Sequence, residues 1–402
     1  MKVSSMRAID RYAGMPLSFL ILFYEKSKRF FVQRKKPGRF NKILVMKFFG
    51  MGSTVLATPL LSLIRKEFQN STIGFLTFEQ NRDLMILLGV ADRCYFLRTD
   101  TYLHFVYDTL CTILKLRRDE YDAVIDLEFF SNFSMTMSYL SAARWRIGYY
   151  VRGTVREYLL DYSVYFNQSR HVTEVFLMLA SGLGNFERKL PVLNVAINGF
   201  SESEKESLFR RLNFRPNGNP VAVLNVNASE LCYERRWPAD RFLRLAEHLR
   251  DRYRAQLVFI GAGSDAEYVA GVIDNLSSKN DLFNLSGRLT LRDLVIIFKS
   301  CSLFITNDSG PLHLASALGV PTVSFFGPET PRLYGPVDGR HLVFYKGIYC
   351  SPCLNVYNAK TAACNGYNLC MREIGVEDVI EKIAKNFTDI LLTKGKADEE
   401  RL

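Results

Sequence analysis

One short polar block, Thr306 to His313, has the residue types and spacing of an anion-binding turn. A hydrophobic run ends at Thr306, a turn with a glycine follows, and Pro311 stands where a helix would begin. The amides at a helix N-terminus point outward without partners and lie at the positive end of the helix dipole. Ser309 and Gly310 are therefore predicted to cradle a pyrophosphate, with the Ser309 hydroxyl as an additional donor.

Two other residues of this block have side chains that could contact the same ligand. His313 falls within the first predicted helical turn and could donate to a phosphate oxygen. A carboxylate facing phosphate is repulsive, so Asp308 is expected to accept a bond from a sugar hydroxyl or to cap the helix. The alternative is that Asp308 and Ser309 are only caps and that His313 is an ordinary helix residue.

A second glycine-rich turn, Gly261 to Ala266, reads G-x-G-x-x-A between a hydrophobic run and a predicted helix. This is formally a dinucleotide-binding motif and makes an NAD-dependent oxidoreductase one alternative function. No acidic residue ends the next hydrophobic run, Leu282–Leu285, where the ribose contact of such enzymes would be needed. If the ligand is another nucleotide, Gly261 borders its nucleoside pocket and Glu267 could reach its ribose.

Four of the eight cysteines are grouped late in the chain with the spacing C-x2-C-x10-C-x5-C. In a chain without secretory features, such a group favours a tetrahedral metal site over disulfides. We expect structural zinc or iron holding the loop 349–371, because four thiolates leave no open position for catalysis. Free or disulfide-bonded thiols remain the alternative. The four residues are Cys350, Cys353, Cys364 and Cys370.

The elements that must position these turns alternate along the chain. From Asn41 onward, short β-branched runs alternate with amphipathic helical segments, which is typical of parallel sheets covered on both faces. A second such series begins near Val221, after a polar, turn-rich stretch. We therefore predict an α/β protein with two Rossmann-like domains, whose parallel sheets face a central cleft. The predicted domains span 41–195 and 196–385, and a polar tail spans 386–402.

The net charge of +11 is concentrated at the N-terminus. Residues 1–40 hold ten Lys or Arg residues against Asp10 and Glu25, a net charge of +8. Because the rest of the chain is nearly neutral, we expect no nucleic-acid partner. Aromatic and aliphatic residues interleave with these cations, as in a helix lying on an anionic membrane. The alternative is a terminal helix packed on the body or on another subunit, and a homo-oligomer is left open.

The chain shows no run long enough to span a membrane and no cleavable signal pattern. We therefore expect a cytoplasmic protein, with the basic segment 1–40 allowing peripheral attachment at the inner face of the membrane.

Three stretches of the chain resemble the heptosyltransferase family of bacterial glycosyltransferases (glycosyltransferase family 9). The run TNDSGPLHLASALGVPTVSFFGPETP is similar to the signature of that family, and ILVMKFFGMGSTVLATPLLSLIRKEF and RRWPADRFLRLAEHL are similar to two other family segments. The resemblance implies two Rossmann-like domains of the GT-B type, with the acceptor held by the first and the nucleotide sugar by the second. It also implies inverting transfer of a sugar without a catalytic metal.

The resemblance assigns roles to individual positions. Asp308, Ser309, Gly310 and His313 match family residues that meet the diphosphate and sugar of the donor. Arg235 stands where the family often has a Lys before Trp-Pro, and such a fixed cation could neutralise the leaving diphosphate. Further phosphate contacts are expected from two polar residues that follow the first strand of this half, Asn227 and Ser229.

One position departs from the family pattern. The acceptor-side loop contains Gly50 and Gly52, after which the family usually has an Asp that serves as general base; here that position is Ser53. A serine hydroxyl does not remove a proton unaided at neutral pH. Either Asp126 or Glu128, at the end of another predicted strand, acts as the base, or the protein binds without catalysing.

The resemblance thus implies a glycosyltransferase that moves a sugar, with heptose as the expected one, from an ADP-heptose-like donor to a cell-envelope glycan or lipid-linked acceptor. Such a reaction belongs to lipopolysaccharide biosynthesis. A non-catalytic nucleotide-sugar-binding or scaffold protein of the same fold is the first alternative, because of Ser53. The oxidoreductase is the second.

Overall fold

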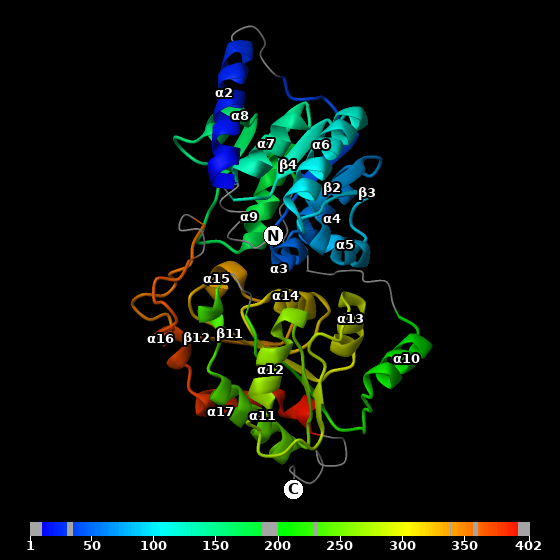
Figure 1. Ribbon diagram of the computed structural model, residues 1–402, viewed down its shortest axis with the longest axis vertical. Coiled ribbons are helices and arrows are strands. Elements are labelled where there is room, and N and C mark those ends of the chain that lie inside the picture. The colour runs from blue at the N-terminus through cyan, green and yellow to red at the C-terminus, as the bar shows by residue number, and fades with distance from the viewer. Residues whose placement is uncertain are drawn as a thin grey trace. The chain divides into compact units, whose positions relative to one another are not determined.

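The computed structural model describes residues 10–29, 35–129, 131–186, 200–228, 232–337, 339–356 and 361–392. The chain divides into two compact units, Met1–Val192 and Leu193–Leu402 (Figure 1). Each unit is built on one six-stranded sheet in which every pair of neighbouring strands is parallel. The α/β class with two parallel sheets is confirmed. The predicted boundary between the domains lies outside the described residues.

The sheet of unit 1 has the strand order β3-β2-β1-β4-β5-β6. The chain therefore moves outward from β1 to β3 and then returns to the other side of β1 with β4. The strands are β1 (Lys42–Met46), β2 (Thr72–Phe78), β3 (Arg93–Leu97), β4 (Ala123–Asp126), β5 (Trp145–Tyr150) and β6 (Tyr162–Tyr165). The helices are α2 (Met15–Arg29), α3 (Met51–Leu56), α4 (Thr58–Glu67), α5 (Arg82–Leu88), α6 (Tyr102–Asp119), α7 (Asn132–Leu140), α8 (Val155–Leu159) and α9 (Val172–Leu179).

The sheet of unit 2 repeats this arrangement with the order β12-β11-β10-β7-β8-β9. Its strands are β7 (Val221–Asn225), β8 (Gln256–Phe259), β9 (Leu282–Asn284), β10 (Leu303–Asn307), β11 (Thr322–Phe326) and β12 (His341–Tyr345). Its helices are α10 (Glu202–Leu212), α11 (Ala239–Tyr253), α12 (Ala266–Ile273), α13 (Leu291–Lys299), α14 (Gly310–Ala317), α15 (Pro331–Tyr334), α16 (Leu369–Arg372) and α17 (Val376–Leu391).

In both units the order in which strands are added to the sheet reverses next to the first strand, between β1 and β4 and between β7 and β10. The two connections that leave such a point run to opposite sides, so a crevice opens at the carboxyl ends of these strands, where open α/β sheets bind ligands. The residues after β1, β4, β7 and β10 are therefore the ones placed to contact a ligand. All four segments contain residues that the sequence singled out.

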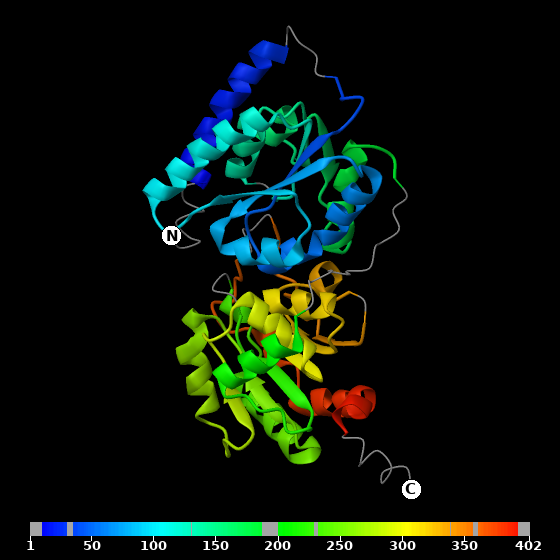
Figure 2. The same ribbon diagram turned by 90° about the vertical axis from the view of Figure 1, so that its right-hand side faces the viewer.

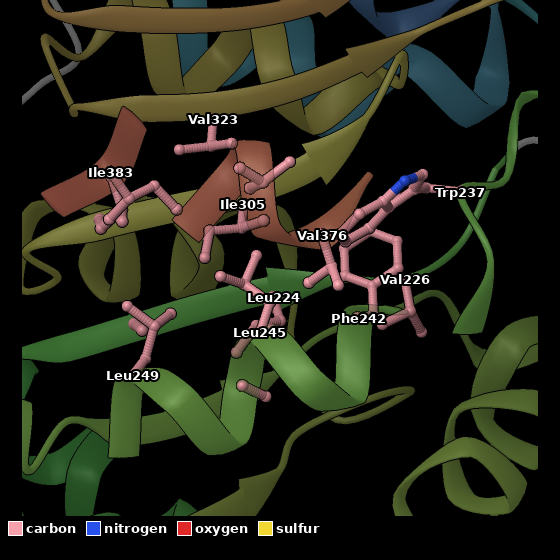
Figure 3. Close-up of a cluster of buried hydrophobic side chains, with 14 of the residues drawn as sticks. Leu224, Val226, Trp237, Phe242, Leu245, Leu249, Ile305, Val323, Val376 and Ile383 are labelled. Atoms are coloured by element: carbon pink, nitrogen blue, oxygen red, sulfur yellow. The ribbon is translucent and has the colours of Figure 1, made fainter. Parts of the chain in front are cut away.

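The core of unit 2 is formed where helices pack against its sheet. Leu224 and Val226 from the β7 segment, Ile305 from β10 and Val323 from β11 are fully buried. In Figure 3 they meet side chains from α11 and α17, including Phe242, Leu245, Leu249, Val376 and Ile383. The Trp237 indole stacks on the Phe325 ring with centroids 4.1 Å apart, which anchors the segment that enters α11.

Helix α17 extends beyond the predicted end of the second domain. It continues to Leu391, and Phe387 and Leu391 are buried against the rest of unit 2. The polar tail expected from residue 386 therefore begins later, because the helix keeps an apolar face through its last turn. The residues after 392 lie outside the described part of the chain.

The helical segment that follows β1 is divided into α3 and α4 at Ala57. Pro59 accounts for the division, since proline is accepted in a first helical turn but disrupts a helix interior. Both short helices follow the turn after β1, which they hold at the edge of the sheet.

Candidate functional site

The polar block of unit 2 is organised around hydrogen bonds between the ends of β7 and β10. Asn225 Nδ2 donates to Thr306 Oγ1 and to Ser309 Oγ, both at 3.1 Å. The hydroxyls of Thr306 and Ser309 are 2.9 Å apart and share a further hydrogen bond. These bonds join neighbouring strands and hold Ser309 in a defined position at the sheet edge.

Ser309 is the N-cap residue of α14, but its hydroxyl makes no capping bond to that helix. The hydroxyl is instead bonded to Asn225 and Thr306, so the Ser309 side chain does not cap α14. Pro311 occupies the predicted place in the first turn. The turn therefore has the form expected of an anion site, with Gly310 at its start and the positive end of the helix dipole behind it.

Asn307 ties the same strand end to the segment before α11. Its Nδ2 donates to the carbonyls of Val226 and Asn227 at 3.2 and 2.9 Å. Its Oδ1 accepts from the Trp237 amide at 2.8 Å. Because Trp237 is two residues after Arg235, these bonds restrain the turn η4 (Tyr233–Arg235) beside the anion site.

Arg235 and Asp308 form the charged centre of this edge. Arg235 Nε lies 3.3 Å from Asp308 Oδ2, and both side chains are mostly buried. Neither of these two atoms makes a hydrogen bond within the described residues. Burial acts to lower the pKa of Arg235, but the carboxylates of Asp308 and Glu329 outweigh it and raise this pKa. The guanidinium is therefore a permanent cation at this position.

Asn227 and Gly261 meet on the neighbouring side of the crevice. Asn227 Nδ2 donates to the Ile260 carbonyl at 3.3 Å, whereas its buried Oδ1 has no hydrogen-bond partner among the described residues. A Cβ atom at Gly261 would lie 2.5 Å from Asn227 Nδ2. Glycine is thus required at 261 by close packing against Asn227, a reason separate from any nucleotide motif.

In unit 1, the turn after β1 carries Gly50, Gly52 and Ser53 at the corresponding edge. Gly50 has a φ of 86°, in the region that favours glycine. The Ser53 hydroxyl donates to the carbonyls of Phe49 and Gly50 at 3.0 and 2.9 Å. Ser53 therefore stabilises its own turn, which is a structural task for the residue at the family's Asp position.

Glu128 lies directly against this turn. Its Oε1 accepts from Lys47 Nζ at 2.8 Å and from the amides of Phe48 and Phe49 at 2.6 and 3.0 Å. Its Oε2 accepts no hydrogen bond within the described ranges, and the residue retains 6% exposure. One oxygen thus anchors the turn and the other is left at the crevice.

Asp126 has a different environment although it is only two residues away. It is fully buried, and its Oδ2 accepts from Arg156 Nη2 at 2.7 Å and from Ser134 Oγ at 2.8 Å. Its Oδ1 accepts from the Glu128 amide at 3.0 Å. Burial raises the pKa of Asp126, and Arg156 acts in the opposite direction. No surface of Asp126 is left for a substrate hydroxyl.

Comparison with known proteins assigns the chain to a family. The family model for glycosyltransferase family 9 (heptosyltransferase) matches residues 112–363, which is more than half of the chain. The chain belongs to this family. The predicted resemblance is therefore confirmed, and the protein is a glycosyltransferase.

The relatives of this glycosyltransferase agree with that assignment. Lipooligosaccharide heptosyltransferase 2 of Campylobacter jejuni is 25% identical over 343 residues, covering 84% of this chain and 95% of the relative. A glycosyltransferase family 9 structure from Veillonella parvula superposes with a TM-score of 0.72 and 21% identity, covering 89% of this chain and 99% of that one. The Escherichia coli ADP-heptose lipopolysaccharide heptosyltransferase II has a TM-score of 0.68 and 21% identity, with 87% and 99% covered. The GT-B fold is thereby confirmed.

Three other residues were predicted to belong to the donor site of this family 9 chain. His313 is buried in the first turn of α14, at 4% exposure. Glu267 is exposed in the first turn of α12. Ser229 lies outside the described residues. Sequence reasoning missed Asn225, although an asparagine at the end of a buried strand could have signalled it.

The four grouped cysteines are all free thiols. Within the described ranges, no group of three or more His, Cys, Asp or Glu side chains is placed to hold a metal ion. The expected structural zinc or iron centre is therefore not supported. The thiols have unlike surroundings: Cys350 is exposed, whereas Cys370 is buried beside Gly327, where an added Cβ would lie 2.7 Å from its sulfur. Burial raises the pKa of Cys370 to about 11.

Proposed function

We propose that this glycosyltransferase moves a heptose from an ADP-linked donor to the core of a lipopolysaccharide or lipooligosaccharide. The names of its relatives support this substrate pair, because they are lipooligosaccharide and lipopolysaccharide heptosyltransferases. One structural neighbour is an ADP-heptose enzyme. We assign the donor to unit 2 and the acceptor to unit 1, as the resemblance implies.

The observation that carries the proposal is the ion pair of Arg235 and Asp308 at the edge of the unit-2 sheet. Arg235 Nε and Asp308 Oδ2 lie 3.3 Å apart without a hydrogen bond to any described residue. A buried ion pair with unused hydrogen-bonding atoms is unfavourable unless a ligand completes it. A diphosphate at Arg235 and the α14 amides, with a sugar hydroxyl on Asp308, would satisfy both groups.

In this mechanism the leaving diphosphate gains negative charge as its bond to the anomeric carbon breaks. The Arg235 cation and the first amides of α14 are fixed before the reaction, so they stabilise that charge without rearranging. We expect transfer to persist in EDTA, because these groups supply the positive charge. Ser309 positions the same oxygens, and Asn227 contributes its unpartnered Oδ1 to the nucleotide.

We propose Glu128 as the base that removes the proton of the attacking acceptor hydroxyl. The hydroxyl oxygen forms a bond to the anomeric carbon with inversion, the diphosphate leaves, and the proton passes to Glu128 Oε2. Three donors on Oε1 hold the carboxylate in one orientation. Asp126 is assigned to the fold instead, because it is fully buried.

The test is a coupled measurement of donor binding and of transfer to a heptose-free core acceptor. We expect Glu128→Gln to bind ADP-heptose normally but to lose transfer by a factor of about 10² to 10⁴. The glutamine oxygen can still accept from the Phe48 and Phe49 amides, which limits damage to the turn. A Glu128→Gln enzyme with full turnover would refute Glu128 as the base.

The donor site is tested separately by Arg235→Met. We expect transfer to fall by about 10² to 10³, since one preorganised charge is lost from the transition state. Arg292→Met is a matched control in the same unit, because Arg292 is 46% exposed in its side chain and pairs only at the surface with Glu204. Equal activity of the two variants would contradict the proposed role of Arg235.

We also propose that the protein works at the inner face of the membrane, where a lipid-linked acceptor would be found. The support is the charge of +8 in residues 1–40, which favours an anionic surface. No helix in the described ranges is long and apolar enough to cross a bilayer.

A further inference from the structure

Helix α2 is unusual because its acidic side chain, Glu25, faces the protein. Glu25 is 1% exposed and accepts from Arg146 Nη2 at 3.2 Å and from the Tyr139 hydroxyl at 2.9 Å. Ser18, on the same inward face, is also 1% exposed. The turn before α2 uses its carboxylate in the same way: Asp10 accepts from the Phe133 amide at 2.7 Å. Both acidic residues of the segment 1–40 are therefore engaged with the body of unit 1.

The outward face of α2 is correspondingly apolar. Four large side chains, Phe19, Leu20, Phe23 and Tyr24, are between 56% and 78% exposed. The inward face is apolar as well, since Ile21 is buried against Met135 and Leu159, so α2 exposes large apolar side chains beyond those that its packing on unit 1 uses. Large apolar side chains gathered on the outward face of a helix indicate an interaction surface.

Helix α6 presents a second apolar stripe. Leu103, Tyr107, Leu110 and Leu114 are 82%, 63%, 59% and 68% exposed. Their spacing of four, three and four residues places them on one face of the helix. Isolated exposed apolar residues are ordinary, but a continuous stripe along a helix marks an interaction site.

The two stripes belong to one side of unit 1. Helix α7 contacts both α2 and α6, so it lies between them. Figure 1 shows α2, α7 and α6 in front of the sheet, and in Figure 2 the dark-blue α2 and the cyan α6 lie along the same flank of the unit. We call this side, formed by the outward faces of α2 and α6, the apolar flank.

The charge around the apolar flank selects its partner. Lys26 on α2 is exposed, as are Lys115, Arg117 and Arg118 at the end of α6. The acidic residues of α6 are bonded to the body, Asp108 to Arg98 and Asp119 to Arg93. A second copy of the chain would bring two basic segments of +8 together, which is repulsive. Exposed apolar side chains bordered by cations instead match a bilayer that contains anionic lipid.

We propose that α2 and α6 together form a membrane-binding surface, with the apolar flank inserted at the level of the headgroups and its lysines and arginines on anionic lipid. This inference deepens the proposed placement at a membrane and rests on it. It assigns half of the surface to α6, outside the basic segment 1–40. Both helices are anchored to unit 1, so the unit itself would be held at the bilayer.

The test is flotation of the full-length protein with vesicles of phosphatidylcholine alone or mixed with phosphatidylglycerol. We expect binding to the mixed vesicles only, and weaker binding in high salt. The double variants Phe19→Ser/Phe23→Ser and Leu103→Ser/Leu110→Ser should each lower the partition coefficient at least about tenfold, because each removes two inserted side chains. Ile86→Ser is the matched control, since Ile86 is 67% exposed on α5, a helix that is not part of the apolar flank.

Two results would overturn the proposal. One is vesicle binding by the α6 double variant that equals that of the wild-type protein. The other is a wild-type dimer in light scattering that both double variants dissociate, which would assign the flank to a second copy. Transfer to a soluble acceptor is measured in parallel and should be unchanged in the variants. A wild-type protein that floats but transfers no heptose would refute the proposed reaction and leave the membrane surface standing.

Discussion

Replacement of Asp126 by alanine should destabilise unit 1 rather than abolish a chemical step alone. The variant leaves Arg156 in the interior at 4% exposure without its carboxylate, and it also removes the acceptor of Ser134 Oγ. Breaking a buried ion pair by deleting one partner costs about 3–5 kcal/mol, because the remaining charge is uncompensated. For a unit of the size of Met1–Val192, each kcal/mol lowers the melting temperature by about 2–4 °C. The expected fall is therefore roughly 6–20 °C.

The assay is thermal unfolding followed by circular dichroism, with and without ADP-heptose. Because the donor is assigned to unit 2, donor binding at low temperature should survive in Asp126→Ala. Lys279→Ala is the control for removing half of an ion pair, since Lys279 and Asp274 are more than 60% exposed in their side chains and such a pair contributes about 0–1 kcal/mol. The reasoning is refuted if Asp126→Ala has the melting temperature of the wild-type protein but has lost transfer. That result would make Asp126 catalytic.

Two further predictions concern stability. Gly74→Ala should cost about 1–3 kcal/mol in urea unfolding, because the new Cβ would lie 2.1 Å from the Tyr121 hydroxyl, whereas Gly271→Ala in α12 has no atom within 4 Å and should stabilise by about 0.5–1 kcal/mol. An equal loss in both variants would contradict this steric argument. The Arg98 hydrogen bond lowers the pKa of Asp108 from 3.8 to about 2, so the ionised carboxylate stabilises the fold above about pH 4 and this contribution is lost as the pH falls through 2. The difference in urea midpoint between wild type and Asp108→Asn should therefore shrink from pH 4 to pH 2, and a constant difference would be evidence against it.

Much of the architecture could be predicted because it depends on local pattern. The strands β1, β7 and β10 are buried on both faces and appear in the sequence as unbroken apolar runs. Pro311 and the preceding polar turn correctly located the start of α14. The strands β5, β6 and β12 were missed: β5 contains the buried Arg146, and β6 and β12 are partly exposed and carry no such run.

The roles of individual polar residues could not be read in the same way. Asp126 and Glu128 are equivalent in sequence, yet their partners Arg156 and Lys47 lie 30 and 81 positions away. The inward position of Glu25 on α2 could not be predicted either, because its partner Arg146 comes 121 positions later. Such pairs exist only after the chain has folded, and no periodicity in the sequence records them.

The two carboxylates at the end of β4, Asp126 and Glu128, support the different roles that we propose for them. Asp126 is the last residue of β4, which pairs with β1, and its side chain is enclosed by α7 and α8 through Ser134 and Arg156. Glu128 comes after the strand has ended and turns toward the loop that follows β1. The strand order reverses between β1 and β4, which places the crevice beyond the ends of these strands. Glu128, which follows the strand end, therefore reaches the crevice, whereas Asp126 does not. With Glu128 proposed as the base, the serine at position 53 is compatible with catalysis, because the carboxylate would come from the end of the neighbouring strand.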